Sequence, residues 1–363
     1  MNFPMNRRHF VAGLAAATTT AASSTLLRAA ARPTGPKIKL GIDNFAVRAM
    51  GWKAPELIAY AAKLKCDTLL ISDLDALGSL DDANLRAIRK QADEAGIGLY
   101  AGSWSICPTS KTFKKNWGTA EEHLRLGLRV SKALGSPVFR VVLGSMEDRK
   151  TEGGIRARIA DTVAVLKACR SDALAAGVKV AIENHAGDMH SWELLDLINA
   201  AGRDFVGANI DSGNAIWTLE DPMDVLETLG PVTICSSLRD DMAWETPDGA
   251  AVQWTAVGDG LIDWKAYAAR WAQLCPQAPI MIETISGGPR MFPYKQPEFW
   301  RHYDRRPEKL AKFEALMRRG RQIPAFKAPP GPEGKQATQD FQRAELEKSI
   351  TYLREKVGLG LRA

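Results

Sequence analysis

Three acidic side chains stand at the ends of three apolar segments that lie far apart in the sequence. Glu183 ends the run VKVAIE, Asp211 follows VGANI, and Glu283 follows PIMI. If these ends meet, the carboxylates cannot face one another uncompensated, because their repulsion would raise their pKa values or require a cation. Oxygen-rich groups of this kind suit divalent ions such as Mg, Mn, Co or Zn. The pattern therefore predicts a metal site built from Glu183, Asp211 and Glu283.

Other reactive side chains follow or interrupt segments of the same kind. His185 lies two residues beyond the first carboxylate, on the same side of an extended strand. It would bind or protonate a substrate oxygen, or else cap the strand end through hydrogen bonds. Asn214 would hydrogen-bond a substrate or form part of a turn, and Trp104 would stack on the face of a sugar. Arg140 stands inside an apolar run, where an inward arginine needs a partner such as a buried carboxylate.

The segments that would position these residues alternate between short apolar runs and longer amphipathic ones. Eight apolar runs, each followed by a segment of helical periodicity, predict parallel strands joined by helical crossovers. These runs span residues 38–43, 66–72, 97–104, 138–144, 178–185, 206–213, 232–240 and 279–286. Eight units favour an α/β fold of the closed (β/α)8 TIM barrel type over a doubly wound open sheet, because no GxGxxG motif follows the first run. In such a barrel the carboxyl ends of all strands meet at one mouth.

The two ends of the chain are expected to lie outside the barrel, which is predicted over residues 37–320. Residues 1–31 hold Arg7, Arg8, an Ala/Thr/Leu-rich stretch and a small-residue cleavage site. This segment resembles a twin-arginine export signal, although an ordinary secretory signal or an organellar leader has similar features. Residues 321–337 are rich in Pro and Gly and predict a linker. Residues 338–363 predict an amphipathic C-terminal helix that packs on the barrel or on a partner subunit.

Composition and charge exclude several classes of function. Without residues 1–31 the chain has 45 basic and 42 acidic residues, which is too even a balance for a nucleic-acid-binding face. No stretch beyond the N-terminus is apolar enough to span a bilayer. The five cysteines show no CxxC spacing, so no zinc-finger or redox role is expected. We expect an exported protein, periplasmic or extracellular, that acts on a small molecule; a homo-oligomer remains open.

The strand-end motifs together resemble those of the xylose-isomerase-like TIM barrels. VAIENH is similar to that family's fifth-strand motif, with Glu183 in the place of the first metal ligand. GANIDSGN is similar to its sixth-strand motif, with Asp211 as the second ligand, and PIMIET to its eighth strand, with Glu283 as the fourth. GDGLIDWKAY resembles the stretch before the seventh helix. The resemblance runs from about Lys37 to about Phe313.

The seventh strand departs from the pattern of this family. Where the family has His-x-Lys-Asp, with the histidine as third ligand, the chain has Ser237, Arg239 and Asp240. Serine is a poor ligand for these metals. The metal would rest on three carboxylates and water, or Asp240 or His185 would take the missing place, or the metal would be weak or absent. Arg239 would add a permanent cation, which would replace part of the ion's charge or bind a substrate oxyanion.

The resemblance implies a sugar isomerase or epimerase. In that family a metal polarises a carbonyl while carboxylates move a proton beside it through an enediolate. Glu183 and Glu283 would then act as base and acid on opposite faces of a sugar or keto-sugar. Two alternatives are a lyase or dehydratase acting on a keto-sugar or cyclitol, and a non-catalytic carbohydrate-binding relative with a degenerate metal site. A nuclease of the same family is not expected, because only four of the five histidines lie beyond residue 31.

Overall fold

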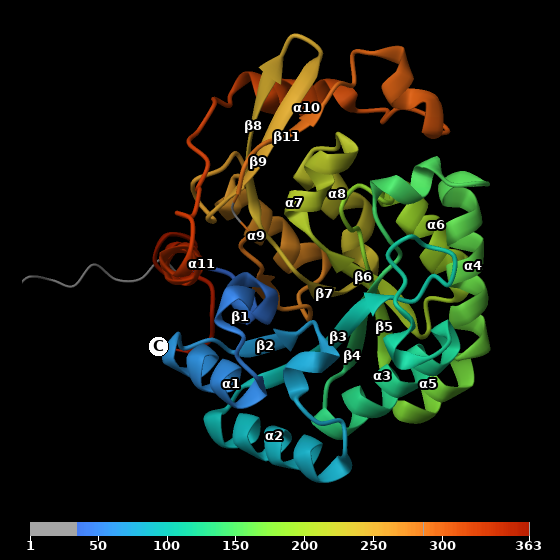
Figure 1. Cartoon of the computed structure of the whole chain (residues 1–363), viewed down its shortest axis with the longest axis vertical. Coiled ribbons are helices and arrows are strands. Elements are labelled where there is room, and N and C mark those ends of the chain that lie inside the picture. The colour runs from blue at the N-terminus through green and yellow to red at the C-terminus, as the bar shows by residue number, and fades with distance from the viewer. Residues whose placement is uncertain (1–34, 286, 363) are drawn as a thin grey trace, which may run out of the picture. The chain divides into compact units, whose positions relative to one another are not determined.

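A parallel eight-stranded sheet forms the centre of the molecule. The computed structural model describes residues 35–285 and 287–362. The sheet has the strand order β10-β1-β2-β3-β4-β5-β6-β7 (Figure 1). Its strands are β1 (Leu40–Asp43), β2 (Thr68–Ile71), β3 (Gly98–Ser105), β4 (Val138–Val142), β5 (Lys179–Glu183), β6 (Val206–Ile210), β7 (Thr233–Ser236) and β10 (Ile280–Ile282). Each of the eight predicted apolar runs therefore contains a strand.

The two outer strands of this sheet, β7 and β10, are joined just beyond the end of β7. Leu238 pairs in parallel with Ile282, its N–H donates to the carbonyl oxygen of Met281 at 2.7 Å, and the N–H of Glu283 donates back to Leu238 at 2.9 Å. This closure confirms the predicted (β/α)8 barrel. It also brings the residues after β7 directly beside the first residue after β10.

The described residues form eleven α-helices, most of which cover the outside of the barrel. They are α1 (Ala54–Lys63), α2 (Asp82–Ala95), α3 (Ala120–Leu134), α4 (Gly154–Ala168), α5 (Arg170–Ala176), α6 (Ser191–Ala201), α7 (Ser212–Ala215), α8 (Pro222–Leu229), α9 (Trp264–Leu274), α10 (Leu310–Arg318) and α11 (Pro332–Tyr352). Local signals set their bounds, as in α3, which begins with a capping box between Thr119 and Glu122 and ends at Gly135 in the left-handed conformation. The main apolar core lies between these helices and the strands.

A smaller apolar cluster fills the interior of the barrel itself. Its buried members are Leu70, Tyr100, Val138, Ala181, Cys235 and Met281. In the strand register, Arg140 on β4 lies opposite Ala181 on β5. Glu183 lies two residues further along β5, nearer the carboxyl ends of the strands, opposite Val142 on β4 and Asn209 on β6. The inward positions therefore change from apolar to charged along the barrel axis, and the charged layer lies toward the mouth.

A three-stranded antiparallel sheet was not predicted from the sequence. It consists of β8 (Asp240–Thr246), β9 (Gly249–Thr255) and β11 (Arg290–Phe292), in the order β11-β9-β8. Figure 1 shows it beside α10. The sequence signal was present, because TPDG in residues 246–249 is a turn sequence between two runs rich in β-formers. The single strand predicted over residues 232–240 is therefore divided between β7 of the barrel and the start of β8, and the chain leaves the barrel at Asp240.

The C-terminal helix packs on the chain's own barrel. Of the five residues on its predicted apolar face, Leu346, Ile350, Leu353 and Val357 are buried in the main core, whereas Phe341 is half-buried and stacks on Phe326. The helix begins at Pro332, inside the segment predicted as a linker, because proline is favoured in the first turn of a helix. The side-chain oxygen of Gln342 accepts a 2.9 Å hydrogen bond from the N–H of Ala49, which ties the helix to the loop after β1.

The export signal predicted over residues 1–31 lies outside the described residues. Within the described part of the chain, no helix is both long and apolar enough to cross a membrane. The five cysteines are buried and unpaired, as expected of small apolar residues.

Candidate active site

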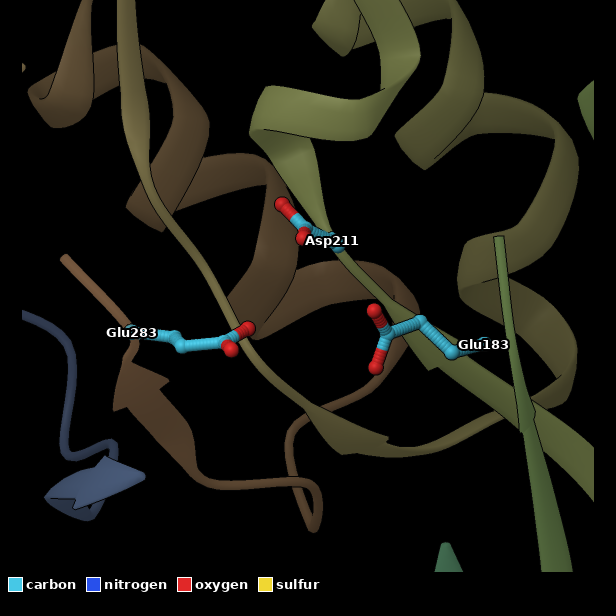
Figure 2. A group of neighbouring side chains, drawn as sticks. All are labelled: Glu183, Asp211 and Glu283. Carbon is cyan, nitrogen blue, oxygen red and sulfur yellow. The ribbon is translucent and has the colours of Figure 1, made fainter. Parts of the chain in front are cut away.

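The three carboxylates predicted from the strand ends come together at the mouth of the barrel. Glu183 is the last residue of β5, Asp211 caps the N-terminus of α7 directly after β6, and Glu283 directly follows β10. One oxygen from each lies within 4.8 Å of the others, and all three residues are buried. Figure 2 shows the three carboxyl groups pointing toward one another from separate elements. The predicted gathering of these side chains is therefore present.

An arginine side chain lies between two of these carboxylates. The Nη2 atom of Arg239 lies 2.6 Å from Oδ2 of Asp211 and 2.5 Å from Oε2 of Glu283. The guanidinium also stacks on the indole of Trp254, with 4.3 Å between its central carbon and the ring centroid. Arg239 is 2% exposed, so these contacts are shielded from solvent and are electrostatically strong.

A second buried arginine pairs with the remaining carboxylate. The Nε of Arg140 donates to Oε2 of Glu183 at 2.7 Å, and its Nη2 lies 2.5 Å from the same oxygen. Asn209 donates a third hydrogen bond to that oxygen at 2.9 Å. The carboxylate partner predicted for Arg140 is therefore Glu183. Its Nη1 also donates to the carbonyl oxygen of Ser103.

Burial and charge act in opposite directions on the pKa values of this cluster. Burial raises the pKa of Glu183 and of Glu283, and it raises that of Asp211 to about 7, while the arginines partly oppose the rise. Burial also disfavours the charge on Arg140 and Arg239, but the surrounding carboxylates outweigh it and raise both arginine pKa values. The two cations are therefore permanent, whereas burial favours the protonated form of each carboxyl group and places the pKa of Asp211 near neutral pH.

The described residues form a cavity of about 410 Å³ at this mouth. Its lining includes Glu283, Arg239, His185, Asn214 and Trp104, five of the residues predicted to act on a substrate. Glu183 and Asp211 are not among the described residues that line it; they lie behind the arginines and Asn214. A small molecule in the cavity would therefore meet one carboxylate of the three directly.

Asn214 links the cluster to the cavity. Its side-chain N–H donates to Oδ2 of Asp211 at 2.6 Å and, more weakly, to Oε1 of Glu183 at 3.3 Å. The side-chain oxygen of Asn214 is buried without a hydrogen-bond partner among the described residues. A buried acceptor left unpaired costs about 1–3 kcal/mol. A substrate hydroxyl would satisfy it.

Asp240, predicted as a possible metal ligand, is directed elsewhere. Its two oxygens accept hydrogen bonds from the backbone N–H groups of residues 258, 260 and 262 and from Nε1 of Trp264. It is absent from the described group of carboxylates whose oxygens lie within 4.8 Å of one another. Asp240 therefore holds the loop before α9.

Several residues of the cavity were not singled out from the sequence. Arg48, in the 3-10 helix that follows β1, and Lys114, in the segment after β3, are exposed side chains that line it, and Trp117 and Trp254 add aromatic surface. Trp254 lies on β9 of the unpredicted sheet and stacks on Trp217 with 4.7 Å between ring centroids. Loop residues of this kind carry no strand-end signal, so their proximity becomes visible only in the fold.

His185 holds a fixed tautomer at the edge of the cavity. Its Nδ1 lies 2.6 Å from the carbonyl oxygen of Gly144, and a carbonyl can only accept, so Nδ1 carries the proton and Nε2 has a free lone pair. The ring also meets the edge of Trp104, with 5.3 Å between centroids. Burial, and then the charge of Arg140, lowers the pKa of His185 to about 3. The imidazole therefore presents Nε2 as a hydrogen-bond acceptor.

We expect His185 to stay neutral from pH 8 to pH 5. Because its pKa is lower in the folded state, the unfolded chain binds the additional proton, and this group takes stability away as pH falls below the usual histidine value of 6.5. Nitrogen NMR of the imidazole should show the neutral Nδ1-protonated form across this range. His185→Gln should make the free energy of unfolding less sensitive to acid. A ring that titrates near pH 6.5 would contradict the assignment.

The sequence pattern of the family described as "Xylose isomerase-like TIM barrel" matches residues 46–303. The match covers most of the barrel and all three clustered carboxylates. The chain belongs to this family.

Solved structures of xylose isomerase-like barrels share the fold at low sequence identity. D-psicose 3-epimerase, solved in the presence of D-fructose, aligns with a TM-score of 0.58 at 16% identity, over 88% of this chain and 100% of that one. The IolI protein, solved with a bound zinc atom, gives 0.54 at 16% identity, over 77% and 96%. A xylose isomerase domain protein from Planctomyces limnophilus gives 0.52 at 17% identity, over 69% and 91%. No curated protein sequence matches the chain.

In this xylose isomerase-like site the three carboxyl groups lie close enough together to bind a divalent ion, but Arg239 occupies the position that the ion would take. An ion bound by Asp211 and Glu283 at about 2.0–2.2 Å would lie against Nη2 of Arg239, which contacts the same two oxygens. The place predicted for the third ligand belongs to Ser237, whose hydroxyl donates a 3.1 Å hydrogen bond to Asp43. With Arg239 in this position, the donor set does not fit a resident metal.

Proposed function

We propose that this xylose isomerase-like protein is a sugar isomerase or epimerase that moves a proton at a carbon beside a carbonyl group. The observation that carries the proposal is the position of Glu283, a buried carboxylate with a raised pKa that lines the cavity together with His185 and Asn214. A cavity of about 410 Å³ suits a small molecule. Membership of the family and the neighbours named as epimerases support the same class.

Glu283 is the proposed base. Its carboxylate takes the proton from the carbon beside the carbonyl, the electrons of that C–H bond form a carbon–carbon double bond, and the carbonyl electrons move to oxygen to give an enediolate. Return of the proton to the neighbouring carbon regenerates the carboxylate. The proton of the enediolate hydroxyl passes at the same time to the adjacent oxygen, so that the old carbonyl becomes a hydroxyl and the aldose–ketose isomerisation is complete. Burial strengthens this base, because a raised pKa makes the ionised form a better proton acceptor.

The spacing of the two glutamates favours this single-base route. Two bases on opposite faces of one carbon would each need to lie about 3 Å from it, which separates their oxygens by about 6 Å. Glu183 and Glu283 offer facing oxygens within 4.8 Å of each other, and Glu183 is tied to Arg140. Epimerisation, in which Glu183 returns the proton to the other face, requires Glu183 to leave Arg140 and reach the cavity.

Three further side chains would hold the sugar. Nε2 of His185 accepts a hydrogen bond from one sugar hydroxyl, and the unpaired oxygen of Asn214 accepts one from another. The indole of Trp104 lines the cavity and stacks on the sugar. Because an export signal is predicted over residues 1–31, we also propose that the protein acts outside the cytoplasm.

Turnover of a panel of aldoses and ketoses in D₂O tests the proposal. We expect an isomerised product in which the migrating position retains part of its original hydrogen, because one carboxyl carries the proton across. Complete replacement by deuterium with inversion at one carbon would indicate epimerisation through two groups. A product lighter by one water would indicate a dehydratase, and binding without turnover would indicate a carbohydrate-binding protein; either would overturn the proposal.

A further inference from the structure

Arg239 occupies the place where a cation is needed. Its Nη2 touches Asp211 and Glu283, two of the three carboxylates that would bind a divalent ion, at 2.6 and 2.5 Å. These are short, charge-assisted hydrogen bonds of the strong kind. With Arg140 on Glu183, two guanidinium groups face three carboxyl groups.

The surrounding residues hold Arg239 in this position. A Cβ on Gly213 would lie 2.1 Å from Cγ of Arg239, so only glycine leaves room for the side chain. The stacked pair Trp254 and Trp217 supports the guanidinium from another side. Ser212 fixes the backbone of Arg239, because its hydroxyl donates to the Arg239 carbonyl oxygen at 2.6 Å and accepts the Arg239 N–H at 3.2 Å. The arginine is therefore a built-in part of the site.

The same side chain still faces the cavity with unused hydrogen-bonding capacity. Arg239 lines the cavity beside Asn214, and Nε of Arg239 is buried without a partner among the described residues. An unpaired donor on Arg239 and an unpaired acceptor on Asn214, two residues that line the same cavity, suit a ligand that carries both a carbonyl and a hydroxyl. An α-hydroxy carbonyl compound, such as an open-chain sugar, has this arrangement.

We infer that Arg239 is the resident cation of this site and takes the place of the divalent ion. Its guanidinium neutralises Asp211 and Glu283 and donates a hydrogen bond to the substrate carbonyl oxygen that becomes the enediolate. The first role stands on geometry alone, and the second rests on the proposed function.

The charges balance in this arrangement without a metal. When Glu283 takes the proton it becomes neutral, and the negative charge appears on the enediolate oxygen. Arg239 keeps its own protons and exchanges one anionic partner for another, so the site's net charge is constant throughout. Preorganised donors of this kind stabilise a developing oxyanion without reorganisation during the reaction.

Metal binding by the full chain tests the inference independently of turnover. The wild-type protein is incubated with Mn²⁺ or Zn²⁺, freed of excess ion, and examined by elemental analysis and by thermal unfolding. We expect far less than one ion per chain, an unchanged unfolding temperature, and turnover that survives treatment with EDTA. One ion per chain, lost in Asp211→Asn, with turnover abolished by EDTA, would overturn the inference.

Variants at the seventh strand provide the matched controls. Ser237→His combined with Arg239→Ala should bind about one ion per chain and unfold at a higher temperature with the ion than without it. Ser237→His alone keeps the guanidinium and should bind none; tight binding by this single variant would contradict the inference even if Arg239→Ala does not fold. Arg239→Lys should bind no ion and should lower kcat by about 10²-fold, because it keeps the charge but loses the planar fork.

The two proposals fail in different ways. If no sugar is turned over but the metal results are as expected, the resident-cation role stands and the proposed function fails. If turnover occurs only with a divalent ion bound at Asp211, the proposed function stands and the resident-cation role fails.

Discussion

Glu283→Gln should lower kcat for sugar isomerisation by about 10²- to 10⁴-fold, the usual contribution of a general base. Glutamine keeps the shape and a hydrogen-bonding oxygen for Arg239, but it cannot take a proton. Arg239 retains Asp211 as a charged partner at 2.6 Å, so the fold should be preserved. Steady-state kinetics and thermal unfolding of the same preparation would separate loss of chemistry from loss of structure.

Two controls sharpen this result. Glu227→Gln removes an exposed carboxylate that pairs with Arg270 on the outside of the barrel, and it should leave kcat unchanged. Glu183→Gln should affect isomerisation far less than Glu283→Gln, because the Glu183 carboxyl lies outside the cavity lining. A Glu283→Gln variant that keeps most of the wild-type rate, or a Glu183→Gln variant that loses as much, would assign the base differently.

Arg140→Leu should lower the free energy of unfolding by about 3–5 kcal/mol, because it leaves the Glu183 carboxylate buried without its cation. The pair is almost fully shielded, with side-chain exposures of 4% for Arg140 and 0% for Glu183. Arg125→Leu is the matched control, since Arg125 pairs with Asp172 on the surface, where the solvent screens the pair, and its loss should change stability far less. Urea unfolding of both variants would measure the difference.

The loss in Arg140→Leu should depend on pH in a defined direction. The pKa of Glu183, already raised by burial, rises further when Arg140 is removed. The folded state then holds a proton that the unfolded chain releases above the usual glutamate range, so stability falls as pH rises and recovers on acidification. The double change Arg140→Leu with Glu183→Leu should recover much of the loss at pH 7. A double variant as unstable as the single one would show that packing is the cause instead.

The barrel was predictable because its signals are local and repeated. Eight apolar runs with glycine-terminated helices between them require only short-range reasoning, and each run proved to contain a strand. The gathering of Glu183, Asp211 and Glu283 followed from the same pattern, because parallel strands in a barrel point their carboxyl ends the same way. The partner of Arg140 was predictable because a buried cation on an inward-facing strand position needs a nearby carboxylate.

The rest of the site depends on side-chain directions that no local pattern contains. The sequence places Arg239 after the seventh strand but does not say whether its guanidinium points into the carboxylates or toward solvent. That choice depends on the absence of a Cβ at Gly213 and on the stacking surface of Trp254, which comes from a hairpin that was not predicted. Asp240 was predicted, as an alternative to His185, to take the place of the missing histidine ligand, yet successive residues of an extended chain point to opposite sides, and the Asp240 side chain binds the loop before α9.

The outer antiparallel sheet is attached to both members of the pair formed by Arg239 and Glu283. Arg239 is followed at once by β8, and the segment after Glu283 leads directly into β11. A change in the length or turn of the hairpin over residues 240–255 would therefore shift the Arg239 side chain relative to Glu283. Exchanging this hairpin between homologous barrels is thus a route to retuning substrate preference while the inner barrel, with its packed interior, is left intact.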